Sequence, residues 1–180
     1  MKTQAFYSRA TQQGAVLFVG LIMLIIITLM GVVAMKSSIL QEKLSAGAMD
    51  QSIAFQAAES ALRDAEIYAN STLDSSSAFT SACTGGLCLP SSTATQSWQS
   101  ISDWTASTLP IVYGANTGAA AISGVALQPR YIIELLPDLA VGSGSSTSSP
   151  TPSNAFRITA MGWGKRASTP IMLQSIYIKS

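Results

Sequence analysis

The pattern of hydrophobic and polar positions begins with a long apolar run near the amino terminus. The 21 residues at 15–35 carry neither charge nor proline. At a rise of about 1.5 Å per residue, a helix of this length spans roughly the 30 Å of a bilayer's hydrocarbon core. Because every backbone polar group in hydrocarbon must bond within the segment, the run predicts a transmembrane helix. The alternative is a buried core helix, although soluble cores seldom need so long a run that is apolar on every side.

The residues before this run predict its orientation. Residues 1–13 are polar and carry Lys2 and Arg9 without an acidic residue. Because basic flanking residues are retained in the cytoplasm, we expect this end to be cytoplasmic and the remainder to point outward. A signal peptide cleaved on the far side is the alternative. It is disfavoured because the apolar run is too long and is followed by Lys36-Ser37 without a small-residue cleavage site.

The helical pattern continues beyond the apolar run. Residues 36–69 contain no proline and are dominated by alanine, leucine, glutamine and glutamate, all of which favour helix. The helix is expected to end near Asn70, where a run rich in Ser, Thr and Asn begins. Apolar residues form two stripes on nearly opposite sides of it. The first stripe contains Met35, Ile39, Ala46, Met49 and Ile53, and the second contains Phe55, Ala58, Leu62, Ala65 and Ala69.

Toward the carboxyl terminus the apolar pattern acquires the period of two that is typical of β-strands. Three such stretches lie at residues 130–136, 156–163 and 171–178. They predict three antiparallel strands. Residues 142–153, between the first two, are rich in Gly, Ser, Thr and Pro, which predicts a flexible surface loop.

The region between the helix and these strands is harder to interpret. Residues 109–113 favour a short strand that leads into a Gly/Ala-rich loop. Trp98 and Trp104 stand in a Ser/Thr-rich run and are expected to anchor a long connection to the core. A surface on which carbohydrate stacks is the alternative for these tryptophans.

The junction before the apolar run resembles a known processing site. Gly14 ends a short basic leader and Ala15 begins the long apolar helix, as in the class III signal of type IV pilins and pseudopilins. The resemblance implies that prepilin peptidase removes residues 1–14 on the cytoplasmic face. It also implies that the new amino terminus at Ala15 is N-methylated.

A second resemblance lies in the helical segment that follows. Residues 35–66 are similar to PilX-type minor pilins, particularly in AFQAAE at residues 54–59. The strands predicted at 130–136 and 171–178 also resemble the carboxyl-terminal sheet of that family. The resemblance implies an α+β, type IV pilin-like fold in which a long amino-terminal helix packs on a carboxyl-terminal antiparallel β-sheet. The first apolar stripe would then face neighbouring subunits, and the second would lie on the chain's own domain.

One position departs from the usual pilin pattern. Most pilins carry glutamate as the fifth residue of the mature chain, and here that residue is Val19. In pilins this glutamate is thought to meet the charged amino terminus of the subunit above it. A subunit with valine brings no such carboxylate, although its Ala15 amine can still receive one from below. This asymmetry predicts a position at or near the top of the filament.

The two cysteines of the chain, Cys83 and Cys88, enclose Thr-Gly-Gly-Leu, whose paired glycines permit a tight turn. Outside the bacterial inner membrane such a pair is expected to be oxidised to a disulfide. Metal binding and redox catalysis are the alternatives. They are disfavoured because the chain contains no histidine.

Composition and charge limit the function classes. Removing Lys2 and Arg9 with the leader changes the formal net charge from +1 to −1, so no basic field for nucleic acid exists. Without histidine there is no Ser-His-Asp or Cys-His arrangement. Residues 162–166 lack the upstream glycine and the Ser/Thr of a phosphate loop. We therefore expect no enzyme activity, no cofactor, no metal and no small-molecule substrate. The pair Glu59–Arg63, spaced i, i+4, is interpreted as helix support.

The resemblance implies a minor pilin that helps to initiate or cap type IV pilus assembly, with a role in adhesion and twitching motility. The expected partners are other minor pilins in a tip complex, the major pilin, prepilin peptidase and the assembly platform of the inner membrane. The chain would cross that membrane once with a periplasmic domain, and then enter the extracellular pilus. A tip adhesin and a pseudopilin of type II secretion are the alternatives. The expected segments are a leader at 1–14, a transmembrane and assembly helix at 15–35, an amphipathic continuation at 36–69, a connecting region with a disulfide at 70–127 and an antiparallel sheet at 128–180.

Overall fold

The computed structural model describes residues 13–90, 95–105, 109–136 and 155–179. Most of the predicted leader and the predicted loop at 142–153 therefore lie outside the described residues. The chain divides into two compact units, residues 1–46 and residues 47–180.

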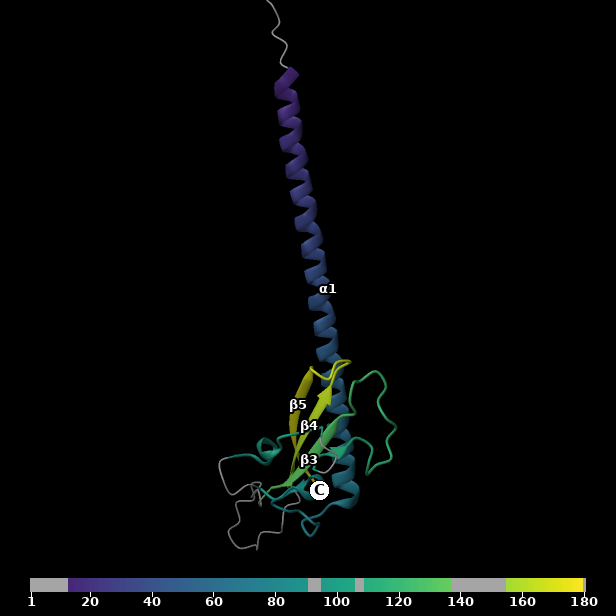
Figure 1. The fold of residues 1–180 in the computed structure, drawn as a ribbon. Coiled ribbons are helices and arrows are strands. Elements are labelled where there is room, and N and C mark those ends of the chain that lie inside the picture. The colour runs from purple at the N-terminus through teal and green to yellow at the C-terminus, as the bar shows by residue number, and fades with distance from the viewer. Residues whose placement is uncertain (1–12, 91–94, 106–108, 137–154, 180) are drawn as a thin grey trace, which may run out of the picture. The chain divides into compact units, whose positions relative to one another are not determined.

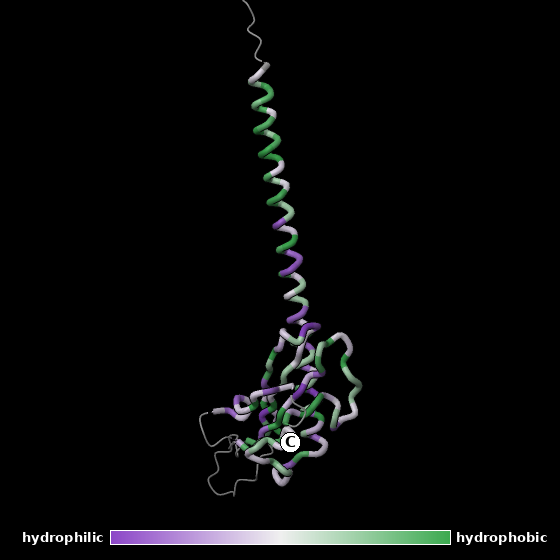
Figure 2. Tube along the Cα trace, in the orientation of Figure 1, coloured by the Kyte–Doolittle hydropathy of each residue, from purple (hydrophilic) through white to green (hydrophobic). Residues whose placement is uncertain are grey.

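A single helix, α1, extends over Gln13–Thr72 and confirms the predicted long helix. It contains no proline, and it ends two residues beyond Asn70, where Ser and Thr compete with helical backbone bonding. Figure 2 shows that its first part is almost uniformly hydrophobic and that polar residues become frequent further along. At its end, the Nζ of Lys179 donates a hydrogen bond of 2.9 Å to the carbonyl of Leu73, where a cation complements the helix dipole.

The unit formed by residues 47–180 contains one five-stranded sheet (Figure 1). Its strand order is β1-β3-β4-β5, and β2 pairs with β3 at the same side as β1. The predicted strands correspond to β3, β4 and β5, and their antiparallel pairing is confirmed. The strands are β1 at Leu87–Cys88, β2 at Ile111–Val112, β3 at Arg130–Leu135, β4 at Ala155–Trp163 and β5 at Pro170–Ile178.

The sheet differs from the prediction in one respect. It is mixed rather than purely antiparallel, because β1 pairs with β3 in parallel. The sequence did not reveal β1, since a two-residue strand shows no period and its pairing depends on the turn that precedes it. The short strand expected within residues 109–113 is confirmed as β2.

One face of the sheet packs against the later turns of α1. The alanines at positions 54, 58, 61, 65 and 69 are fully buried there, and their small side chains allow the helix to approach the strands closely. The closest approach is at Gly162 of β4, where an added Cβ would lie 2.4 Å from both the carbonyl oxygen of Ala54 and the amide nitrogen of Ala58. The core on this face includes Tyr131, Ile133, Phe156 and Ile158.

The predicted second stripe is correct for its alanines and wrong for Phe55. That side chain is 46% exposed, and Leu62 is only partly buried. The buried face is shifted toward Ala54 and Ala61, because the strands accept only small helix side chains at their closest approach. The hydrophobic periodicity gave the correct helix but a stripe that is slightly rotated.

The opposite face of the sheet carries a second core cluster. It contains the two cysteines and Ile101, Trp104, Ile132 and Trp163, with Trp98 packed against them. The prediction that Trp98 and Trp104 anchor the connecting region is therefore confirmed. The sheet thus lies between α1 on one side and the connecting segment on the other.

Candidate functional site

The apolar part of α1 is exposed along its whole described length. Within residues 1–46, each side chain from position 14 to position 46 is exposed in the structure. Among the described residues, α1 is the one helix that is long and apolar enough to cross a membrane, judged by length and composition. Apolar surface of this extent is unfavourable in water, so the segment requires lipid or other protein surfaces around it.

The predicted processing residues lie at the start of this helix. Gly14 and Ala15 are exposed, and a side chain added at Gly14 would meet no other part of the structure within 4 Å. Val19 follows about one turn later and is 55% exposed. No other described residue covers this junction, and cleavage after Gly14 and N-methylation of Ala15 stay predictions.

A buried carboxylate joins the start of the helix in the second unit to the β4–β5 turn. Asp50 accepts hydrogen bonds from the backbone N–H of Lys165 at 2.6 Å and from the hydroxyl of Thr169 at 2.7 Å. The hydrogen bond from Thr169, together with those from the turn backbone, holds the pKa of Asp50 below its ordinary value. The carboxylate therefore fixes the turn against the helix.

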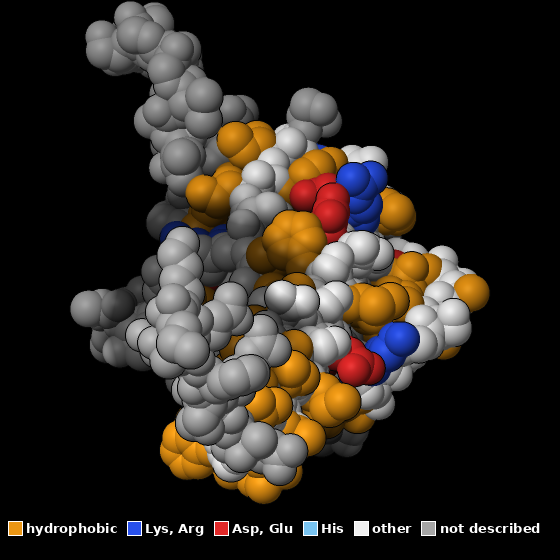
Figure 3. All heavy atoms as spheres, turned by 90° about the horizontal axis from the view of Figure 1, so that it is seen from above, with side chains coloured by type: hydrophobic (Ala, Val, Ile, Leu, Met, Phe, Trp, Pro, Cys, Tyr) orange, Lys and Arg blue, Asp and Glu red, His pale blue; other side chains and the backbone are white. Residues whose placement is uncertain are grey.

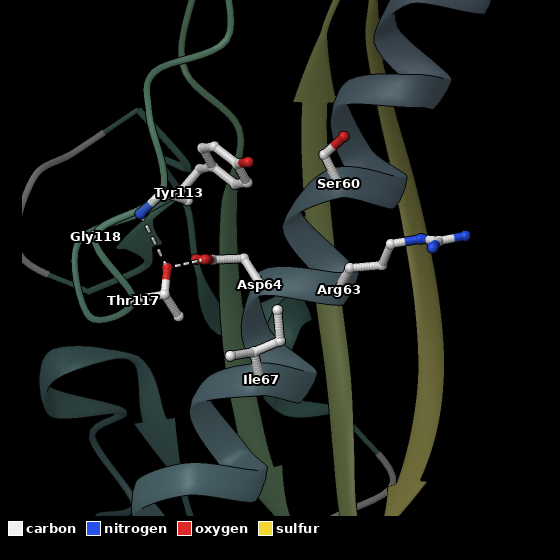
Figure 4. A pocket seen from close by; sticks show the side chains of 8 residues that line it. Ser60, Arg63, Asp64, Ile67, Tyr113, Thr117 and Gly118 are labelled. Carbon is white, nitrogen blue, oxygen red and sulfur yellow. Dashed lines mark hydrogen bonds between the residues drawn. The ribbon is translucent and has the colours of Figure 1, made fainter.

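A second buried carboxylate holds the loop that follows β2. Asp64 accepts hydrogen bonds from the backbone N–H of Gly114 at 2.9 Å and from the hydroxyl of Thr117. Figure 4 shows Asp64 pointing from α1 toward this loop, whereas Arg63 points away from it. The shallow pocket between the helix and the loop is lined by Asp64, Thr117, Ile67 and Tyr113, among others. Its acidic group is already bonded within the protein, so the pocket offers no free carboxylate to a ligand.

Tyr131 of β3 lies beneath this region and is fully buried. Its hydroxyl has no hydrogen-bond partner within the described residues. Burial raises the pKa of Tyr131 well above its ordinary value, and the negative charge of Asp64 raises it further. The phenol is therefore a neutral core group at physiological pH.

The roles of Asp50 and Asp64 were not predicted from the sequence. Their position in the sequence could have indicated a buried role, because both acids lie on the side of the helix that the buried alanines occupy. An acid on an apolar stripe needs a partner from another element, and only the structure shows which backbone groups and hydroxyls supply it.

Cys83 and Cys88 form a disulfide, as predicted, with their Cα atoms 4.2 Å apart. The turn between them uses Gly85 and Gly86 at positive φ values of 63° and 75°, which glycine adopts without strain. Both cysteines are buried against the second face of the sheet. Their sulfurs are joined to each other and so are not thiolate ligands. Among the described residues, no group of three acidic or cysteine side chains is placed to hold a metal.

The buried carboxylate of Glu134 links the connecting segment to the same face of the sheet. Glu134 of β3 is 3% exposed and meets Arg157 of β4 at 3.3 Å. It also accepts a hydrogen bond of 3.2 Å from the hydroxyl of Ser97 in the connecting segment. The ion pair predicted between Glu59 and Arg63 is present at 3.2 Å on the exposed side of α1. Neither pair has the geometry of a catalytic site, and both are accounted for by their structural contacts.

The exposed surface carries few charges. Figure 3 shows one face of the molecule, on which hydrophobic side chains are abundant and the acidic and basic groups of the described residues are scattered. This face is consistent with packing against other proteins.

Comparison with known families gives two matches. The family described as "Type IV pilus assembly protein PilX C-term" matches residues 80–179, and the family described as "PilX N-terminal" matches residues 13–63. The first match covers most of the connecting region and the sheet, and the second covers the apolar helix and most of its continuation. No curated protein and no solved structure matches the chain.

Proposed function

The chain belongs to the PilX family of type IV pilus assembly proteins, and on this premise we propose that it is a minor pilin that helps to initiate or cap the pilus. The observation that carries the proposal is the fully exposed apolar helix joined to a unit that has its own buried core. A helix of this kind suits both a lipid bilayer and the helical interior of a filament. The PilX family is a structural component of the pilus, and the proposed role needs no catalysis.

The proposed topology follows from charge. Lys2 and Arg9 would hold the amino terminus in the cytoplasm, so the unit formed by residues 47–180 would lie in the periplasm before assembly. The disulfide agrees with this orientation, because the periplasm is an oxidising compartment. Protease added to spheroplasts should digest the sheet-containing unit of the chain. Protection of that unit until the inner membrane is opened would contradict the orientation.

The proposed processing site is the peptide bond between Gly14 and Ala15. Replacement Gly14→Phe should leave an uncut precursor in the membrane, because prepilin peptidase would no longer accept the junction. Gly20→Ala is the matched control, since a side chain there also meets nothing within 4 Å. Intact-mass measurement of the membrane-bound and pilus-bound protein shows whether each variant retains residues 1–14. Assembled protein that retains residues 1–14 would contradict the proposal.

The proposed position at the filament tip rests on Val19. An unpaired charge in hydrocarbon costs several kcal/mol, so a glutamate that enters the filament needs an amine above it. The chain brings no such glutamate, but its own Ala15 amine can receive one. A subunit of this kind suits the top of the filament, where nothing above it requires neutralisation.

Imaging of labelled pili tests the tip position. A label within residues 142–153, which lie outside the described residues, should appear at one end of each pilus. Val19→Glu should allow the chain to enter the shaft as well, whereas Val19→Leu should not. Regular labelling of the wild-type protein along the shaft would show that valine does not restrict its position.

Deletion of the gene tests the role in assembly. Loss of surface pili, restored by the wild-type chain but not by Gly14→Phe, is the expected result. Normal pili without attachment would instead indicate a tip adhesin, and blocked release of exported proteins would indicate a pseudopilin of type II secretion.

A further inference from the structure

The outer edge of β5 is long and regular. Among the described residues, β5 is the last strand of the sheet and pairs only with β4. The two strands match nine residue pairs one to one, from Ala155 with Ile178 to Trp163 with Pro170, without a bulge. The outer side of β5 therefore presents an uninterrupted row of backbone N–H and C=O groups.

This edge lacks the features by which exposed strands usually avoid pairing, namely a charged residue, an interior proline or a bulge. The sequence of β5, PIMLQSIYI, contains no charged residue, and its single proline is its first residue. Lys179 directly follows the strand, and a lysine at this position could oppose pairing with another strand. Its Nζ instead donates to the carbonyl of Leu73 at the end of α1. Within the described part of the chain, the edge is therefore open to a further strand.

The direction of α1 disfavours a second copy as the partner. Three contacts show that α1 and β5 run in the same direction within the second unit. These are Asp50 with Thr169, Glu66 with Ser175 and Leu73 with Lys179.

Two identical edges would pair antiparallel about a two-fold axis, which would reverse one α1 relative to the other. Gly47, from which each chain continues toward its apolar segment, would then lie at opposite ends of the pair. Two copies anchored in one membrane do not meet this requirement, so the partner strand should come from a different protein.

The surroundings of the edge define the chemistry of the partner strand. Ile176 and Ile178 are 59% and 50% exposed, and by the period of two they share the sheet face of Met172, opposite α1. Because β5 contains no charged residue, a charged side chain of the partner strand would find no opposite charge beside the middle of β5. Arg166 is exposed in the turn before β5 and provides positive charge at that end. Lys165 in the same turn instead lines a pocket with Ile122 and Val125 of the loop before β3.

We propose that β5 accepts an extended strand from a different protein of the pilus by β-augmentation. The incoming strand is uncharged over its middle, places apolar side chains beside Ile176 and Ile178, and carries an acidic residue level with Arg166. Backbone hydrogen bonds along β5 provide affinity, and the exposed isoleucines and the basic turn provide specificity. The proposal rests on the function proposed above, because a pilus must supply the partner.

Site-specific photocrosslinking of the full chain in piliated cells tests this proposal. A benzophenone amino acid replaces Ile178, and mass spectrometry identifies the crosslinked peptide. The expected peptide comes from another pilus protein, alternates apolar residues and has an acid at one end. The substitution Ile176→Lys should lower this crosslink at least tenfold, because lysine on an edge strand opposes pairing. The matched control is Ile67→Lys, since Ile67 on α1 is also 59% exposed, and it should leave the crosslink unchanged.

Several results would overturn the proposal. These are a crosslink to a second copy of the chain, a crosslink to the apolar helix of another subunit, no crosslink at Ile178, or a crosslink that survives Ile176→Lys. An equal loss in both lysine variants would also overturn it, because the effect would then not belong to the edge. A further combination is that deletion abolishes pili while Ile176→Lys cells keep normal pili and an unchanged crosslink. That combination would leave the proposed function intact and refute strand pairing at the β5 edge. Normal pili after deletion would instead refute the proposed function, whatever crosslink is found.

Discussion

The contact between Gly162 and α1 offers the sharpest test of the packing described above. In the change Gly162→Ala, the new Cβ would lie 2.4 Å from the carbonyl oxygen of Ala54 and 2.4 Å from the amide nitrogen of Ala58. Both atoms belong to the helix backbone, so no side-chain rotation can relieve the overlap. The helix and β4 must separate, which disturbs the alanine face that is buried against the sheet.

The magnitude follows from the kind of atom that is displaced. Overpacking a close-packed core typically costs about 1–3 kcal/mol. Because backbone is displaced on both sides, we expect the upper end of that range, about 3 kcal/mol. Since 1.4 kcal/mol is a factor of ten, the ratio of folded to unfolded protein should fall by about two orders of magnitude.

The assay is unfolding of the full chain by guanidinium chloride in mild detergent, followed by tryptophan fluorescence. Trp163 and Trp104 are buried in the same unit and report its unfolding. Gly47→Ala is the matched control, because a side chain there meets nothing within 4 Å. It should be neutral or stabilising by up to about 1 kcal/mol through helix propensity.

A second variant separates backbone overlap from side-chain crowding. Ala58→Gly removes a methyl group but leaves the backbone atoms that the new Cβ would meet. Combined with Gly162→Ala, it should therefore not restore stability. A Gly162→Ala midpoint equal to that of the wild type, or a full rescue by Ala58→Gly, would refute the reasoning.

Three further predictions concern stability. Replacing Cys83 and Cys88 by serine should lower the free energy of unfolding by roughly 2 kcal/mol through the loss of a short closed loop. In the wild type, alkylation without reduction should label no cysteine. Labelling of both cysteines would contradict the disulfide. Because hydrogen bonds, first that from Thr169, depress the pKa of Asp50, this carboxylate should stabilise the fold above its ordinary pKa and cease to do so as the pH falls through its lower folded value. Asp50→Asn should therefore flatten the acid limb of stability against pH, and an unchanged acid limb in that variant would contradict the role. Burial raises the pKa of Tyr131, so the wild type should lose stability as the pH rises above about 10, where the unfolded phenol ionises. The drop in melting temperature between pH 7 and pH 11 should be smaller in Tyr131→Phe than in the wild type. An equal drop in both would contradict the raised pKa of Tyr131.

Much of this fold could be predicted from local pattern. The long helix, its end near Asn70 and the three principal strands follow from hydrophobic period and from residues that favour or interrupt helix. The disulfide followed from Cys83 and Cys88, the paired glycines between them and the lack of histidine. These features depend on residues close together in the chain, so the sequence carries them directly.

The tertiary structure decided the features that join distant residues. Asp50 binds a backbone group 115 residues later, β1 pairs with β3 in parallel, and Phe55 is exposed although it continued an apolar stripe. Periodicity shows which side of a helix is apolar, but the strand that packs on it determines which positions become buried and how large their side chains can be. The alanine face and Gly162 are small because backbone meets backbone there, and that distance exists only once helix and sheet are packed together.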